Sequence, residues 1–291
     1  MTMCKHCKMI DRTNEFLIKH GDMPSYYIIK ENDEYETLTE KLHNELQSLF
    51  ERVHEEIIQT LIEEGKLPSG SLQRKSFLEA FYSELFGEEF GEIIANYSVE
   101  SAEKGFKYIA DQLRSFDIDV AIDNIPDRTR KLLHERNYKF SQDTFERIKG
   151  DVRNSLEVSQ EQGLGINEAA DALKDEFNSI EEYRLKRIAR TEINTAQGEG
   201  RYLSLGENGA EYIKWITAKD DRVRGLDPKD KANHVALHGC VVRYGEAFPN
   251  GLRYPGDRSG PLEEWINCRC KLGVYIPDVG EVNITTPFYV A

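Results

Sequence analysis

The stretch SIEEYRLKRIARTEINTAQGEGRYLSLG, residues 179–206, decides the fold of this chain. Ser179 and Glu182 have the spacing of a capping box, and Gly206 is a typical residue to follow a helix end. The next stretch, AEYIKWITA at residues 210–218, changes to a period of two, which predicts a strand. We therefore expect one long helix that leads into a small β-sheet.

The residues around this helix extend the prediction to a compact α+β domain at 165–276. A short helix, GINEAADALKDEF, precedes it, with Asn167 as the expected cap. Two more strands are expected, in GCVVRYGEAF (239–248) and in EEWINCRCKLGVYIP (263–277). Loops rich in Gly, Pro and Asp separate them.

Residues 30–163 are predicted to be mostly helical, so the fold class expected for the whole chain is α+β. One apolar stripe recurs every three or four residues and ends before Gly65. A later helix is expected from Ser141 as N-cap to Gly163. The aromatic side chains of this region are interpreted as core. Residues 1–29 are expected to be irregular, and residues 277–291 form a tail with little pattern.

Composition excludes several classes of function. The formal net charge is −14 and no basic stripe is visible, which argues against a protein whose main task is to grip duplex DNA. No apolar run is long enough to span a membrane, and the first residues lack the apolar segment of a signal peptide. We therefore expect a cytosolic chain with reduced thiols and no membrane partner.

Cysteine and histidine gather in HVALHGC (234–240) and INCRC (266–270). A tetrahedral zinc site needs four N or S ligands, and five candidates lie within this part of the chain: His234, His238, Cys240, Cys268 and Cys270. His234 and His238 would share a face of a helix, and Cys268 and Cys270 would share a face of a strand. The favoured interpretation is a packed corner in which the cysteines act as small apolar side chains, with a structural zinc as the alternative.

Two other groups of residues have side chains that could carry chemistry. The CKHC motif at residues 4–7 precedes no βαβ unit, so redox chemistry is not expected and a terminus without a fixed role is favoured. Acidic residues crowd the C-terminal loops, but no motif of hydrolases or nucleotide-binding proteins occurs. We interpret one set of charged residues as a network that holds the long helix against the following loop, and not as catalytic groups. Its members are Arg190, Glu192, Asp221, Arg222 and Arg224.

The order of five short motifs, from IARTEINTAQGEGR to NCRC, resembles the Mu F-like minor head proteins of tailed phages, also called phage head morphogenesis proteins. The resemblance covers roughly residues 165–275, and five motifs in the right order are specific although each alone is weak. The matching positions are Arg190, Thr191, Glu192, Trp215, Asp221, Arg222, Arg224, His234, Leu237, Gly239, Pro255, Gly256, Asp257, Asn267, Cys268, Arg269 and Cys270.

The resemblance implies a minor capsid protein inside the procapsid, near the portal, with a role in head assembly, DNA packaging or delivery. It implies portal, major capsid or scaffold proteins as partners, proximity to packaged DNA, and a virion location after assembly in the host cytoplasm. It implies no catalytic residue and no cofactor. Two alternatives remain: an enzyme that acts on nucleic acid or a host target through a cleft of His234, Glu192 and Asp221, and a zinc-stabilised interaction module.

Overall fold

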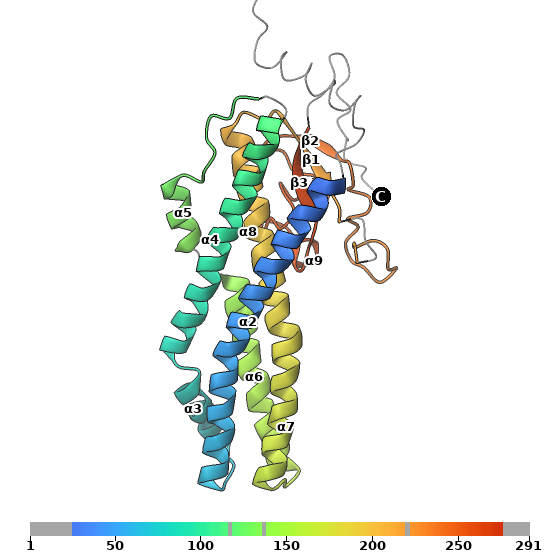
Figure 1. The fold of residues 1–291 in the computed structure, drawn as a ribbon. Coiled ribbons are helices and arrows are strands. Elements are labelled where there is room, and N and C mark those ends of the chain that lie inside the picture. Colours follow the sequence, from blue (N-terminus) through green and yellow to red (C-terminus); the bar gives the residue numbers. More distant parts are fainter. Residues whose placement is uncertain (1–24, 116–117, 136–137, 219–221, 276–291) are drawn as a thin grey trace, which may run out of the picture. The chain divides into compact units, whose positions relative to one another are not determined.

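The computed structural model describes residues 25–115, 118–135, 138–218 and 222–275 (Figure 1). Its helices are α2 (Ser25–Glu64), α3 (Ser71–Phe81), α4 (Glu84–Ser115), α5 (Asp127–His134), α6 (Lys139–Glu161), α7 (Ile166–Ser179), the π-helical turn η1 (Ile180–Leu185), α8 (Lys186–Glu207) and α9 (Leu262–Trp265). Its strands are β1 (Tyr212–Ile216), β2 (Val241–Arg243) and β3 (Lys271–Tyr275). The predicted α+β class is confirmed. Among the described helices, none has the length and apolar character needed to cross a bilayer.

The chain divides into two compact units that are interleaved along the sequence. The first comprises Met1–Thr37, Ser98–Leu133 and Thr191–Ala291, and the second comprises Leu38–Tyr97 and His134–Arg190. Each compact unit combines segments that are distant in sequence. The division into segments at 30–163 and 165–276 stays a prediction. The divisions fall within α2, α4, α5 and α8.

The described part of the second unit is helical, and its core follows the predicted apolar stripe. The buried members of the stripe are Leu38, Leu42, Leu46, Leu49, Ile57 and Leu61. Gly65 follows the end of α2 with a φ of 62°, a left-handed conformation that glycine adopts without strain. The ring of Phe50 lies 5.1 Å from that of Phe86 and 5.9 Å from that of Phe90. The aromatic residues therefore form core, as predicted.

A buried histidine is part of this aromatic core. The ring of His54 stacks on that of Phe177, with the centroids 3.7 Å apart. Its Nε2 lies 2.9 Å from the hydroxyl of Tyr82, and its Nδ1 lies 2.9 Å from a carboxylate oxygen of Glu181. Burial lowers the pKa of His54 below its usual value, although Glu181 acts in the opposite direction. His54 is therefore neutral at pH 7.

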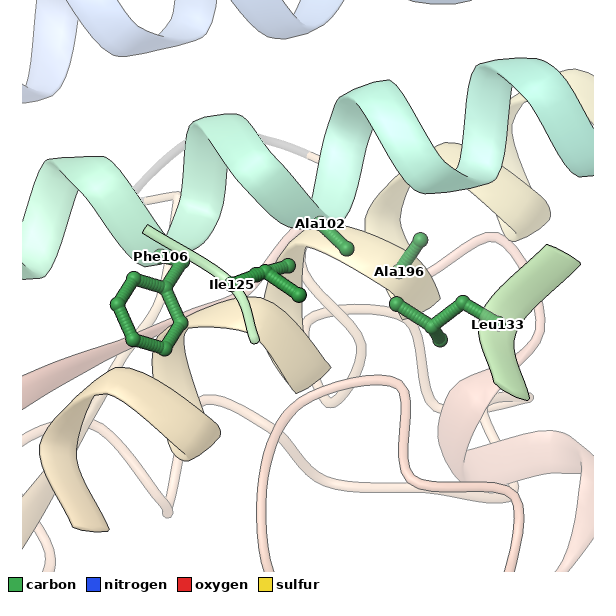
Figure 2. Close-up of a cluster of buried hydrophobic side chains, with 5 residues drawn as sticks. All are labelled: Ala102, Phe106, Ile125, Leu133 and Ala196. Carbon is green, nitrogen blue, oxygen red and sulfur yellow. The ribbon is translucent and has the colours of Figure 1, made fainter. Parts of the chain in front are cut away.

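The first unit contains the sheet and the functional candidates. The sheet has the order β2-β1-β3, and both pairings are antiparallel. Beside it, α4 and α8 contribute to a cluster of buried side chains (Figure 2), which consists of Ala102, Phe106, Ile125, Leu133 and Ala196. The small alanines allow close approach of the two helices. A Cβ atom added to Gly105 would lie 2.3 Å from the carbonyl oxygen of Gln197, so the backbones are nearly in contact there.

Several predicted boundaries are wrong, and each has a local cause. Ser179 lies inside a continuous helical path, because α7 runs through η1 into α8 and no cap is formed. The cap of α7 is Gly165, whose amide donates to the Glu168 carboxylate, instead of Asn167. The helix expected to begin at Ser141 already begins at Lys139.

The third predicted strand is also shorter than expected. The segment 263–277 begins with the short helix α9, and only Lys271–Tyr275 pair with β1. Cys268 and Cys270 therefore precede the strand, so the prediction that they share a strand face is wrong. His234 and His238 lie in consecutive turns and not on a helix, so the prediction that they share a helix face is also wrong.

Candidate functional site

Two hydrogen bonds of Arg224 and the pairing of β3 with β1 bring His234 close to Cys268 and Cys270. The amide of His234 donates to the carbonyl of Arg224, and the Arg224 guanidinium donates to the carbonyl of Ile266, two residues before Cys268. Arg224 thus joins the turn that carries one candidate ligand to the turn that carries the others. Cys270 is held on its other side because β3 begins at the next residue and pairs with β1.

A further hydrogen bond joins α8 to the NCRC motif. Asn267 has a φ of 50°, a left-handed conformation that asparagine tolerates better than most residues. Its amide donates to the hydroxyl of Thr191, which is buried in α8. Two signature positions that are distant in sequence thus fix the turn that precedes the two cysteines.

His234, Cys268 and Cys270 form one group of potential metal ligands. Nδ1 of His234 lies 3.6 Å from Sγ of Cys268 and 3.5 Å from Sγ of Cys270. All three ligand atoms lie within 4.8 Å of one another, and all three residues are buried. Trp215, also fully buried, has its ring edge-on to the imidazole at 5.4 Å between centroids. The signature tryptophan therefore forms one wall of the group.

The other two predicted ligands have different partners. Nδ1 of His238 lies 3.1 Å from the hydroxyl of Thr217 and accepts a hydrogen bond from the Thr217 amide. Sγ of Cys240 donates to the carbonyl of Ala236 at 3.5 Å. Neither residue belongs to the group around His234. The structure thus brings together three of the five residues predicted as ligands.

Two residues that the sequence pattern did not indicate orient the imidazole. Oε2 of Glu264 lies 3.1 Å from Nε2 of His234, on the ring edge opposite the sulfur atoms. The side-chain amide of Asn250 donates to the same oxygen at 2.9 Å. The only feature of the sequence that could have indicated Glu264 is its position four residues before Cys268. No sequence pattern around Asn250 connects that residue to the group.

The electrostatics of the group are strongly coupled. Burial acts to lower the pKa of His234, but hydrogen bonds with Cys268 and Glu264 outweigh it and raise that pKa to about 9. The hydrogen bond with Cys270 and the neighbouring imidazole hold the pKa of Cys268 well below its usual range. The same hydrogen bond and burial raise the pKa of Cys270. The group therefore favours a thiolate at Cys268 beside a positive partner.

The residues that the structure describes include only part of the predicted charged network. Glu192, buried in α8, forms an ion pair with Arg258, a residue that the sequence analysis did not select. Arg222 is exposed, Arg190 falls in the second unit, and Asp221 lies outside the described residues. The cation of Arg258 also lies over the ring of Trp265, at 5.4 Å from its centroid. The described pairing thus joins α8 to the loop that follows the YPGD motif.

The YPGD motif packs directly on α8. Gly256 has a φ of 92°, and an added Cβ would lie 2.7 Å from Cα of Thr195. A Cβ added to Gly198 would lie 2.2 Å from the carbonyl oxygen of Pro255. Asp257 accepts hydrogen bonds from the amide and the guanidinium of Arg253, which closes the turn. Glycine is required at these positions because two backbones touch.

The expected cleft of the enzyme alternative was His234, Glu192 and Asp221. His234 pairs with Glu264, whereas Glu192 pairs with Arg258. Both side chains are buried, with 1% of their surface exposed. The described geometry therefore places these two residues in separate polar groups.

A family model described as Phage Mu protein F like protein matches residues 150–273. This segment is phage Mu F-like. The match confirms the resemblance and contains all the signature positions from Arg190 to Cys270. The Mu F-like likeness associates the chain with phage head morphogenesis, a structural role. Comparisons with curated proteins and with solved structures give no match.

Proposed function

We propose that this Mu F-like chain is a minor capsid protein of a tailed phage. It lies inside the procapsid near the portal and aids head assembly, DNA packaging or delivery. The observation that carries the proposal is the family match over residues 150–273. Its location is the capsid interior, after assembly in the host cytoplasm.

The contacts of the signature residues support a structural role over a catalytic one. The carboxylate of Asp257 faces the guanidinium of Arg253, and that of Glu192 faces Arg258. Each pair joins a loop to itself or to α8 and leaves the carboxylate occupied by an internal cation. Charge pairs of this kind specify how loops pack and supply no free acid or base.

The surface supports protein partners, namely the portal, major capsid or scaffold proteins. A hollow of the second unit is lined by Glu45, Glu51, Glu55, Glu89 and Glu92, with Arg52 among them. Acidic surface of this kind disfavours direct contact with packaged DNA. Two leucines of the same unit are largely exposed, Leu72 by 84% and Leu85 by 75%, and both would gain by burial on a partner.

The test is co-purification of the full chain with the portal protein encoded by the same phage genome, with the scaffold and major capsid proteins in parallel. We expect the portal protein to be retained, and the double variant Leu72→Asp/Leu85→Asp to retain at least several-fold less. Ser76→Asp, at an exposed position of α3, is the matched control and retains the wild-type amount. Absence of binding to all three proteins, together with absence of the chain from purified virions, would overturn the proposal.

A further inference from the structure

The geometry points to a zinc site in which Nδ1 of His234 and the sulfur atoms of Cys268 and Cys270 bind one ion. This inference concerns the Mu F-like segment itself and does not depend on the role in head assembly. Nitrogen and sulfur donors of this kind suit zinc, and a buried setting suits an ion that stabilises the fold.

The first support is the spacing of the ligand atoms. Bonds of about 2.3 Å from zinc to sulfur and about 2.0–2.1 Å to nitrogen imply a sulfur–nitrogen separation of about 3.6 Å in a tetrahedron. The observed separations from Nδ1 of His234 are 3.6 Å to Cys268 and 3.5 Å to Cys270. Three side chains from two turns thus already have the spacing of ligands around one centre.

Hydrogen bonding alone explains this arrangement less well. Nδ1 of an imidazole carries either one lone pair or one proton, so in either state it makes one good hydrogen bond. Two sulfur atoms nevertheless lie at nearly equal distances from Nδ1 of His234. An ion between them satisfies the nitrogen and both sulfur atoms at once, and it also offsets the cost of burying the thiolate charges.

The second support lies on the other side of the imidazole. Ligand histidines almost always donate their second ring N–H to a carboxylate or carbonyl, which fixes the tautomer and the ring orientation. Glu264 occupies that position at Nε2 of His234, and Asn250 holds the same carboxylate oxygen. The proton on Nε2 leaves the lone pair of Nδ1 directed at the two cysteines.

The test is the metal content of the purified full chain, together with its cobalt spectrum. Both are measured in a Cys4→Ser/Cys7→Ser background, so that the CKHC motif cannot contribute thiols. We expect one zinc per chain, and visible and near-ultraviolet absorption from thiolate-bound cobalt after exchange. Cys268→Ser and His234→Ala lose the metal. Cys240→Ser removes a buried thiol outside the group and keeps the full amount, as the matched control.

A second variant keeps the test decisive if loss of a ligand unfolds the chain. Glu264→Gln retains all three ligands and should weaken zinc affinity by about 10–100-fold, the usual range for partners of ligand histidines. Competition with a chelator dye, with circular dichroism to confirm folding, measures this change. A folded background protein that carries no zinc and gives no thiolate–cobalt absorption overturns the inference. Equal metal loss in Cys240→Ser and Cys268→Ser would overturn it as well.

Discussion

Gly200 provides a sharp test of the packing between α8 and α4. It lies in α8 opposite Ala102 of α4, and a Cβ added to it would lie 2.0 Å from the carbonyl oxygen of Ala102 and 2.8 Å from the carbonyl carbon. Ordinary contacts of this type are 3.4–4 Å long, so the substitution Gly200→Ala forces the two backbones apart by more than 1 Å. Backbone atoms cannot rotate away as the end of a flexible side chain can.

Two opposing effects set the size of the change in stability. Alanine is favoured over glycine inside a helix by roughly 0.5–1 kcal/mol. Overpacking in a tight contact costs typically 1–3 kcal/mol, and occasionally more. Because this clash involves backbone, we take the upper end and expect Gly200→Ala to lower the free energy of unfolding by about 2 kcal/mol. For a protein of this size that corresponds to a decrease in Tm of roughly 4–8 °C.

Gly91→Ala is the matched control. Gly91 also lies inside a helix, α4, but an added Cβ meets no atom within 4 Å. Because no clash opposes the higher helix propensity of alanine, the free energy of unfolding of this variant should exceed that of the wild type by roughly 0.5–1 kcal/mol. Differential scanning calorimetry and urea denaturation of the two full-length variants and the wild type measure both changes. If Gly200→Ala proves as stable as Gly91→Ala, the close approach of α4 and α8 is refuted.

Two further predictions concern buried polar groups. Burial lowers the pKa of His54, so the unfolded state binds more protons than the folded state below about pH 6.5, and stability should fall as the pH decreases from 7 to 5. In thermal unfolding across that range, the Tm of His54→Gln should depend less on pH than that of the wild type. An unchanged dependence would contradict the burial of this ring. Arg258→Met removes the cation paired with buried Glu192 and should lower the free energy of unfolding by about 3 kcal/mol or more. Arg153→Met, at an exposed position of α6, is the control and should change it by less than about 0.5 kcal/mol. Equal losses for the two variants in urea denaturation would refute the pairing.

Periodicity predicted the helices and the strands well because it reports which face of an element is buried. The alternation in residues 210–218 predicted β1, and the leucine stripe predicted the buried face of α2. Helix ends were predicted less well. A Ser and a Glu at capping spacing do not end a helix when the preceding residues are helical as well, and α7 therefore continues through Ser179. The capping pattern at Ser179 and Glu182 is a local preference, whereas the continuous helix is stabilised by core contacts along its length, and these outweigh the local preference.

The candidate site was predicted in part. The sequence marked His234, Cys268 and Cys270 as chemically unusual, and the structure brings these three together. It also suggested that His238 and Cys240 could join them, but both have other partners in the fold. Residue type alone could not separate the two sets, because contacts with residues distant in sequence determine which side chains meet. Arg224 joins the turn of His234 to Ile266, whereas Thr217 binds His238.

The sequence by itself determined the α+β class, the Mu F-like character of residues 150–273 and the identity of the residues that can carry chemistry. Tertiary structure alone decided the roles of Glu264, Asn250 and Arg258, which have no local pattern. The physical reason is that hydrophobic periodicity arises from single elements, each with one face toward the core. Polar pairing instead depends on which buried charge or ring nitrogen lies within about 3 Å, and only the folded chain sets that distance.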